Sequence, residues 1–265
     1  LGNPYASAID LHEFIDDNAG VIDGTIQLWQ QWSGASHYLN EYNGGYAQVN
    51  KTGSTRAYQF IGIEGATNGS QDGTKKPSRY LPVGQGFITE IVSSGTIVFK
   101  NSQRVFVKEA EADGSYNNGS VFFRSIASSE NESDSETSEE SLMQKIRLEF
   151  NSVNGPATKR ELLLGFSEQT SDGYDYGYEA INIETYADDL NDELATIQAY
   201  APITDDKIVP LNLRSSGNYN YTIEITETEN ISDDQEIYIK DNFTGEYFNL
   251  KNELPYEFSS EVGEF

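Results

Sequence analysis

Short segments in which apolar and polar side chains alternate recur along the chain, and this two-residue period constrains the fold more than any other feature. Residues 144–150 (QKIRLEF) alternate cleanly, and residues 25–29 (TIQLW) do so as well. Successive side chains of a β-strand point to opposite faces of its sheet, so the period predicts strands with one buried face. The apolar period of a long helix is scarce, and we expect one short helix at residues 9–15.

The amino-acid composition favours the same fold class. Tyr occurs 17 times and Phe 13 times, whereas Met occurs once, and aromatic residues are enriched in strands. Hydrophobic residues make up 37% of the chain, which is enough to fill a packed core. The absence of cysteine excludes disulfides, a thiol nucleophile and thiolate metal sites. We therefore predict an all-β protein.

Turn signals divide the 265 residues into two predicted domains. We expect a jelly-roll-like β-sandwich over residues 1–203, followed by a small immunoglobulin-like β-sandwich over residues 204–265. The second domain is predicted from five short strands at about ten-residue spacing, with residues 241–245 as a hairpin turn. Residues 128–141 (SSENESDSETSEES) carry no apolar side chain, so we expect an exposed acidic loop in the first domain.

Three further local predictions concern turns. Asn43, Gly44 and Gly45 are expected to form a turn between two short strands at residues 36–40 and 46–50. Residues 87–92 and 96–100 are expected to form one hairpin, and residues 144–150 and 159–166 another.

The net charge of −26 limits the partners of the chain. Nucleic acids are unfavourable, because phosphate binding needs clustered Lys and Arg, and anionic membrane surfaces are unfavourable for the same reason. No stretch approaches the roughly 18 apolar residues that cross a bilayer, so we expect no transmembrane segment. The start at Leu1-Gly2-Asn3 and the stop at Phe265 lead us to expect an internal piece of a longer protein.

Several motifs in order along the chain carry a resemblance to a known group of proteins. They are LGNPYASAID at residues 1–10, YLPVGQGFITE at 80–90, GTIVFKNSQRV at 95–105, ELLLGFSEQTSDGYDYGYEA at 161–180, and IYIKDNFTGEYFNL followed by PYEFSSEVGEF at 237–265. Together they resemble the C-terminal region of large secreted and cell-surface proteins of Flavobacteria (Bacteroidota) that are exported by the type IX secretion system. Two positions depart from the pattern: Ala6 stands where Pro is usual, and Val83 precedes Gly84.

The resemblance implies a location and a fold more than a chemistry. It implies a secreted protein on the exterior of the outer membrane, whose partners are type IX secretion or surface-anchoring components that act through neighbouring domains. The parents of such regions include adhesins, enzymes and structural surface proteins, so fold kinship does not decide function.

Catalytic motifs are absent from the sequence. Neither His12 nor His37 stands in a motif with a nucleophile, and no phosphate-binding glycine loop occurs. A pair of carboxylates suited to glycoside hydrolysis stays open, but with 43 acidic residues some pairs lie at that distance by chance. We therefore expect a protein that is not an enzyme, with no catalytic residues.

A structural calcium ion is one hypothesis for the acidic loops, and the cofactor is otherwise unknown. Calcium takes six to eight oxygen ligands, and Asp172 and Asp175 are placed to offer two carboxylates around one turn. The alternative is a turn whose Asp side chains accept hydrogen bonds from nearby backbone amides. Other acidic clusters are Asp16-Asp17-Asn18, Asp188-Asp189 with Asp192, and Asp205-Asp206.

Carbohydrate binding is the second hypothesis. Trp32 precedes Ser-Gly and Tyr42 precedes Asn-Gly, so both rings are candidates for exposed loops on which a sugar stacks, whereas Trp29 is expected in the core. The alternative is that these rings fill the sandwich interior. Tyr174, Tyr176 and Tyr178 either share one face of a strand or pack under an adjacent loop, and we favour the second.

The sequence thus predicts a non-catalytic structural or adhesive module of a surface protein. The alternative is an accessory carbohydrate-binding module, with a polysaccharide partner and a possible dependence on calcium.

Overall fold

The computed structural model describes residues 1–33, 43–59, 73–109, 119–123, 143–182, 187–191, 195–251 and 254–265. The regular secondary structure of these residues is almost entirely β-strand, which confirms the predicted all-β class. The helical elements are α1 (Leu11–Asp17) and the 3-10 turn η2 (Asn101–Gln103). The strands are β1 (Ala8–Asp10), β2 (Ile26–Ser33), β3 (Asn43–Val49), β4 (Ser54–Gln59), β5 (Tyr80–Leu81), β6 (Arg104–Val105), β7 (Gln144–Ser152), β8 (Lys159–Phe166), β9 (Ala180–Ile181), β10 (Asp189–Asn191), β11 (Ala195–Tyr200), β12 (Asn212–Ser215), β13 (Tyr219–Glu229), β14 (Tyr238–Lys240), β15 (Tyr247–Asn249), β16 (Tyr256–Ser260) and β17 (Gly263–Glu264).

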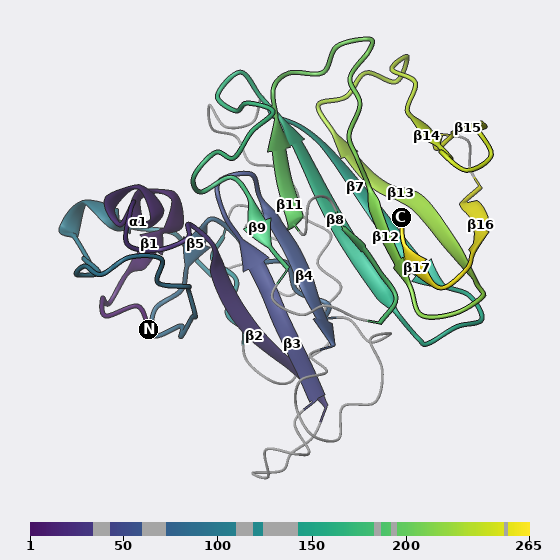
Figure 1. Cartoon of the computed structure of the whole chain (residues 1–265). Coiled ribbons are helices and arrows are strands. Elements are labelled where there is room, and N and C mark those ends of the chain that lie inside the picture. The colour runs from purple at the N-terminus through teal and green to yellow at the C-terminus, as the bar shows by residue number, and fades with distance from the viewer. Residues whose placement is uncertain are drawn as a thin grey trace.

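The N-terminal part packs α1 beside the small sheet β5-β1-β6, at the left of Figure 1. The buried face of the helix includes Leu11, Phe14 and Ile15. Asp10 caps the helix, because its carboxylate accepts a 3.1 Å hydrogen bond from the backbone N–H of His12. The helix begins two residues later than predicted, since β1 pairs with β5 and β6 as far as Asp10. No helix in the described part of the chain is long and apolar enough to cross a membrane.

The antiparallel sheet β2-β3-β4 forms the next layer. The turn predicted at Asn43, Gly44 and Gly45 is wrong, because these residues belong to strand β3. A Cβ atom at Gly44 would lie 2.4 Å from the carbonyl oxygen of Gln30 and 2.7 Å from Cζ2 of Trp29. The glycine is therefore needed for the close approach of the neighbouring strand and ring rather than for a turn.

The largest sheet has six strands in the order β16-β13-β7-β8-β11-β9. Strands β7 and β8 form the predicted hairpin, which the antiparallel register from Gln144 opposite Phe166 to Asn151 opposite Lys159 confirms. Strand β11 pairs with β8 in parallel, so the chain crosses over between them through residues 167–194. Figure 1 shows this sheet at the centre of the molecule, with the β2-β3-β4 sheet beside it.

Strand β8 is buried on both faces. Its even-numbered side chains Leu162, Leu164 and Phe166 join an apolar core with Phe150, Leu190 and Tyr221. Its odd-numbered side chains face the β2-β3-β4 sheet, where Glu161 forms an ion pair with Arg56 of β4. The six-stranded sheet therefore lies between the β2-β3-β4 sheet on one side and the strand β10, which carries Leu190, on the other.

The strand pairing crosses the predicted division at residues 203/204. Strand β13, from the C-terminal segment, pairs with β7 from Tyr221 opposite Ser152 to Glu229 opposite Lys145. Strand β16 then extends the same sheet beyond β13. The two predicted domains thus contribute strands to one sheet, since the ladder of β7 is completed by residues 219–229.

The hairpin predicted for residues 87–100 is wrong. Within residues 73–109 these residues form no paired strands, and Ile88 and Ile91 instead make single bridges to Gln27 and Ile22. The hairpin turn predicted at residues 241–245 is confirmed between β14 and β15. There the Asp241 carboxylate accepts hydrogen bonds from the next backbone amides, and Gly245 adopts a φ of +78°. Residues 36–40 and the predicted acidic loop at 128–141 lie outside the described residues.

Candidate functional site

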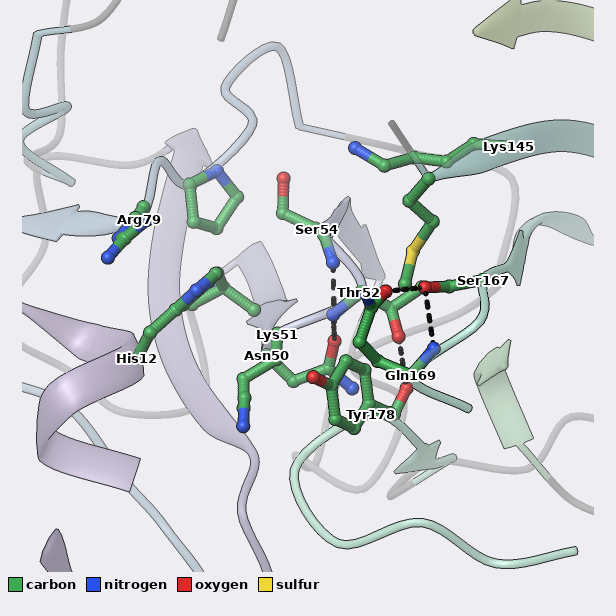
Figure 2. Close-up of a pocket in the computed structure, with 14 residues that line it drawn as sticks. His12, Asn50, Lys51, Thr52, Ser54, Arg79, Lys145, Ser167, Gln169 and Tyr178 are labelled. Atoms are coloured by element: carbon green, nitrogen blue, oxygen red, sulfur yellow. Dashed lines mark hydrogen bonds between the residues drawn. The ribbon is translucent and has the colours of Figure 1, made fainter. Parts of the chain in front are cut away.

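A cavity of about 270 Å³ opens where α1, the turn between β3 and β4, the start of β7 and the segment after β8 meet. Its polar lining includes Asn50, Lys51, Thr52, Lys145, Ser167 and Gln169. Figure 2 shows these side chains around one space, with Tyr178 beside them. The lining comes from segments far apart in the sequence, so the cavity depends on the packing of several layers.

The turn between β3 and β4 forms the floor of the cavity. The Asn50 Oδ1 atom accepts hydrogen bonds of 2.9 and 3.3 Å from the backbone amides of Thr52 and Gly53. The backbone N–H of Asn50 also donates to the carbonyl oxygen of Gly53 at 2.9 Å. Gly53 has a φ of +150°, a conformation that other residues adopt only with strain. An asparagine followed three positions later by glycine is thus the local reason for the turn.

Two glycines allow this turn to lie directly on the six-stranded sheet. A Cβ atom at Gly53 would lie 2.9 Å from Cδ2 of Leu163 on β8. A Cβ atom at Gly165 would lie 2.5 Å from Cγ2 of Thr52 and 2.9 Å from Sδ of Met143. All three distances are shorter than those that real Cβ atoms show, so larger residues at these two positions would push the turn away from the sheet.

One buried polar atom beside the cavity has no partner. The Asn50 Nδ2 atom makes no hydrogen bond with the described residues, although Asn50 is 0% exposed. A buried donor without an acceptor costs about 1–3 kcal/mol, so such groups are rare in native structures. Because Asn50 Oδ1 is held by the turn, its amide group keeps one orientation.

Two lysines supply positive charge at the cavity. Lys51 Nζ lies 2.9 Å from Oδ1 of Asp16 and 4.7 Å from the centre of the Tyr178 ring. Burial opposes the charged form of Lys51, but the hydrogen bond to Asp16 and the nearby charges outweigh it and raise the pKa of the ammonium group. Lys145 Nζ lies 3.0 Å from Oε2 of Glu229. An ammonium group has three donors, so each lysine keeps hydrogen-bonding capacity beyond this carboxylate.

The opposite wall of the cavity is fixed by an ion pair to the helix cap. Nε and Nη2 of Arg79 each donate a 2.8 Å hydrogen bond to a different oxygen of Asp10. Asp10 also caps α1 through the amide of His12, which lines the same wall. This bidentate geometry orients the guanidinium group and holds the helix start against the cavity.

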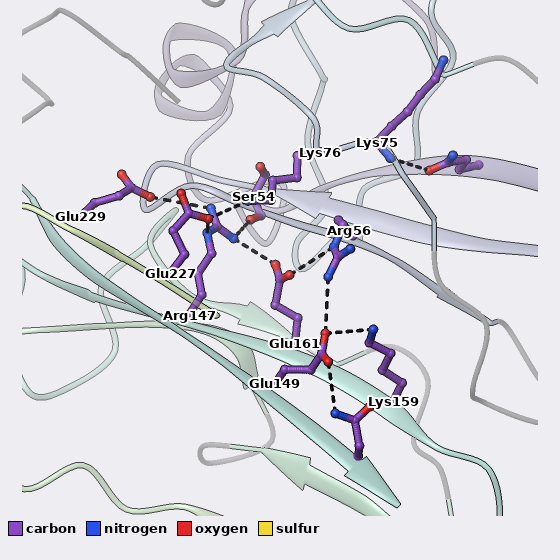
Figure 3. A network of polar contacts seen from close by, with 12 residues as sticks. Ser54, Arg56, Lys75, Lys76, Arg147, Glu149, Lys159, Glu161, Glu227 and Glu229 are labelled. Carbon is purple, nitrogen blue, oxygen red and sulfur yellow. Dashed lines mark hydrogen bonds and ion pairs between the residues drawn. The ribbon is translucent and has the colours of Figure 1, made fainter. Parts of the chain in front are cut away.

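Beside the cavity, a network of charges fills the space between the β2-β3-β4 sheet and the six-stranded sheet (Figure 3). Arg147 on β7 donates hydrogen bonds from Nη1 to Glu161 at 2.9 Å and to the carbonyl oxygen of Ser54 at 2.6 Å. The other side of Glu161 pairs with Nε of Arg56 at 3.3 Å. Both Arg147 and Glu161 are almost fully buried, so the two sheets are joined here by ion pairs rather than by apolar contacts.

The network continues outward to less buried partners. Its further ion pairs are Arg56–Glu149, Lys159–Glu149, Arg147–Glu227, Lys76–Glu227 and Lys145–Glu229. Five basic side chains thus gather here, out of 17 in a strongly acidic chain. Lys145 belongs both to this network and to the cavity, so the two features are continuous.

Glu179 lies behind the cavity wall formed by the turn at residues 176–178. Its Oε2 atom accepts a 2.9 Å hydrogen bond from the Asp175 amide, while its Oε1 atom has no partner among the described residues. Burial, together with the charge of Asp175, raises the pKa of the Glu179 carboxyl to about 8. This carboxyl is therefore mainly protonated at neutral pH.

Neither ring predicted to bind carbohydrate is placed by the structure on a described loop. Trp32 lies within strand β2, so the predicted loop position is wrong, and the surroundings of its side chain are outside the described part. Tyr42 lies outside the described residues. Trp29 is half-buried and packs edge-to-face on Tyr46, with ring centres 5.0 Å apart.

The two residues predicted to bind calcium are engaged with protein groups. Asp172 is exposed, accepts a hydrogen bond from the Ala201 amide and forms an ion pair with Lys207. Lys207 also donates a hydrogen bond to Asp172, and this bond is the main cause that lowers the pKa of the Asp172 carboxyl. Asp175 accepts hydrogen bonds from the amide and the hydroxyl of Ser171, at 2.5 and 2.9 Å. These contacts correspond to the alternative interpretation, in which the acidic side chains stabilise a turn.

Two of the other acidic clusters, at residues 16–18 and 188–189, are also engaged with protein groups. Asp189 forms a buried bidentate ion pair with Arg160, and Asp188 accepts a 2.8 Å hydrogen bond from the hydroxyl of Tyr221. Asp17 pairs with Lys100 at 2.5 Å. Within the described ranges, no three His, Cys, Asp or Glu residues lie close enough to hold a metal ion.

The tyrosines at 174, 176 and 178 belong to a loop and turn rather than to a strand, so they do not form a common face. Tyr176 is half-buried, and its hydroxyl donates a 3.0 Å hydrogen bond to the carbonyl oxygen of Ile15. The carbonyl oxygen of Tyr178 accepts a 2.6 Å hydrogen bond from Thr52. These contacts tie the turn to α1 and to the floor of the cavity.

Sequence reasoning missed the main polar features. Arg147, Glu149 and Glu161 occupy the polar positions of alternating strands, where a solvent-exposed face was expected. A second sheet covers that face instead. The motif Asn50-Lys51-Thr52-Gly53 carried a usable turn signal, but nothing in the sequence indicated that this turn borders a cavity.

Comparisons with known proteins place the whole chain in one family. Residues 1–265 match the family described as "Domain of unknown function (DUF8693)". No curated protein and no solved structure matches the chain.

Proposed function

Since the chain belongs over its whole length to the DUF8693 family, whose description assigns no activity, we propose from its own contacts that it is a non-catalytic structural module of an exported cell-surface protein. The observation that carries this proposal is the two-sided burial of β8. Its apolar face packs on Phe150 and Leu190, and its charged face pairs with Arg56 across the sheets. Six strands from residues 144–260 form the continuous sheet to which β8 belongs, and such a sheet suits a rigid spacer.

The roles of the ionisable side chains support the same proposal. Arg147, Glu161 and Asp189 each stabilise the packing of layers through ion pairs. The backbone amide of His12 serves the helix cap. The motifs at residues 1–10 and 80–90 supply the proposed location, which is the outer-membrane exterior reached through type IX secretion.

Protease treatment of intact producing cells tests this proposal. With an antibody against residues 1–265, we expect the protein to be degraded on intact cells and to fractionate with the outer membrane. Protection until the cells are lysed would contradict the surface location. A panel of polysaccharide substrates tests the other half, because reproducible turnover by the purified chain would contradict a non-catalytic role.

An accessory carbohydrate-binding role is the second candidate, and the cavity at Asn50 is the observation that favours it. Glycan-array binding with and without calcium tests this role. Binding that Trp32→Ala removes would support the sequence-based prediction, whereas binding only with calcium would support a metal site at the Asp-rich loops.

A further inference from the structure

We infer that residues 87–92, the edge segment, form a docking edge to which a positively charged peptide of another protein adds as a β-strand. This goes beyond the structural role proposed above. It rests on the backbone groups, the exposed apolar side chains and the charge of the edge segment.

The edge segment lies beside the start of strand β2. Ile88 exchanges two backbone hydrogen bonds with Gln27 of β2, of 2.8 and 2.9 Å. The carbonyl oxygen of Glu90 and the amide of Val92 bond to the backbone of residues 21–23, at 3.1 and 2.9 Å. The bridges at Ile88 and Ile91 are both antiparallel. Residues 88, 90 and 92 thus direct backbone groups toward the protein.

The backbone groups of Thr89 and Ile91 point the other way, because successive residues beside an antiparallel partner alternate between inward and outward bonding. Within the described residues, neither their N–H nor their C=O groups make a hydrogen bond. Such a row of unpaired groups is a template for another strand. A strand added here would extend the β2-β3-β4 sheet beyond the edge segment.

Exposed apolar side chains accompany these backbone groups. Ile88, Ile91 and Val92 are 50%, 53% and 57% exposed. Tyr174 adds an exposed ring, since its hydroxyl donates a 3.3 Å hydrogen bond to the carbonyl oxygen of Asp23. The Asp23 carboxylate in turn accepts a 3.0 Å hydrogen bond from the hydroxyl of Thr89. A bound strand would therefore gain apolar contacts as well as backbone hydrogen bonds.

Charge selects the kind of strand. Glu90 is exposed, and its carboxylate makes no ion pair or hydrogen bond within the described part of the chain. Side chains of an extended segment alternate between faces, so Glu90 lies between Ile88 and Val92 on one face. A complementary strand places a basic side chain opposite Glu90 and apolar side chains on either side of it. A second copy is unfavourable, because each chain carries a net charge of −26.

Fluorescence anisotropy with a labelled synthetic peptide tests the inference on the full chain at low salt. The probe is Thr-Val-Thr-Lys-Thr-Val-Thr, which reads the same in both directions. We expect saturable binding of this peptide. The same peptide with glutamate in place of lysine should bind about tenfold more weakly or worse. A peptide with N-methylated backbone amides should also lose at least that much affinity, because it cannot pair with the edge.

Glu90→Lys is the main variant. We expect it to weaken the lysine peptide about tenfold and to strengthen the glutamate peptide, which a merely structural role of Glu90 would not do. Glu257→Lys is the matched control, because Glu257 is exposed on β16 at the edge of the six-stranded sheet and the net charge changes equally. Ile91→Pro removes an outward N–H that has no partner in the protein, and it should also abolish peptide binding.

Four results would overturn the inference. They are no saturable binding of the lysine peptide, equal affinity for the N-methylated peptide, equal effects of Glu90→Lys and Glu257→Lys, and a dimer in sedimentation that Ile91→Pro abolishes. The last result would show that a second copy occupies the edge. If Ile91→Pro does not fold by circular dichroism, the comparison of the two glutamate variants still decides.

Discussion

Arg147 on β7 and Glu161 on β8, two neighbouring strands of the six-stranded sheet, form a 2.9 Å ion pair on the face that the β2-β3-β4 sheet covers, where their side chains are only 4% and 2% exposed. Burying two charges costs free energy, which their attraction offsets only when the geometry is good and further hydrogen bonds are made. Arg56 and the carbonyl oxygen of Ser54 provide those further partners. The sheets are therefore held in a specific register by directional contacts.

Removing one partner of this pair should be costly. Arg147→Met leaves the buried carboxylate of Glu161 under-compensated, and we expect the free energy of unfolding to fall by about 3–5 kcal/mol. The double variant Arg147→Met, Glu161→Leu should recover part of this loss, because it removes the buried negative charge as well. Urea unfolding followed by tyrosine fluorescence measures both. If the loss of unfolding free energy in the double variant equals the sum of the losses in the two single variants, the two residues are not coupled.

Gly53→Ala tests the close approach of the β3–β4 turn to the sheet. Alanine at this position must adopt a φ of +150°, and its methyl group would lie 2.9 Å from Cδ2 of Leu163. We expect a loss of stability larger than about 1 kcal/mol. Gly84→Ala is the control, because Gly84 also has a positive φ of +71° but a Cβ atom there meets nothing within 4 Å. Equal thermal shifts for the two variants would argue that packing against Leu163 contributes nothing.

Glu179 should make the free energy of unfolding depend on pH between about 4.5 and about 8. Burial raises its folded-state pKa from the ordinary 4.5 to about 8, so the folded protein holds this proton over a range in which the unfolded chain has lost it. Its contribution to stability is therefore full below about pH 4.5 and is lost as the pH rises through 8. Glu179→Gln mimics the protonated form. Urea unfolding at pH 5 and at pH 7.5 should show a smaller decrease in stability for the variant than for the unmodified protein.

Asp175→Asn distinguishes a turn-stabilising carboxylate from a calcium ligand. Asp175 accepts two hydrogen bonds from Ser171, and weakening them should cost about 0.5–1.5 kcal/mol. The loss in melting temperature should be the same in calcium and in a chelator. A larger loss in calcium would instead support the predicted metal site at Asp172 and Asp175.

The strands were predictable where alternation was strong, as in the β7–β8 hairpin. What covers each face of a strand was not predictable. A polar residue such as Glu161 looks the same in the sequence whether water or a second sheet lies over it. Gly44 shows a related limit, since its role is a close contact with Trp29 from another strand. The cavity combines Asn50, Lys145 and Tyr178, which no local pattern relates.

The pairing of β13 with β7 has a consequence for any shortened form of the protein. If the chain were cut near residue 203, the outer edge of β7 would lose its ladder partner from Glu229 to Tyr221. Its unpaired backbone N–H and C=O groups would then be open to strands of other molecules, and such bare edges promote aggregation. The C-terminal segment thus acts as a protective cover for the sheet, and fragments that lack it should associate into insoluble oligomers.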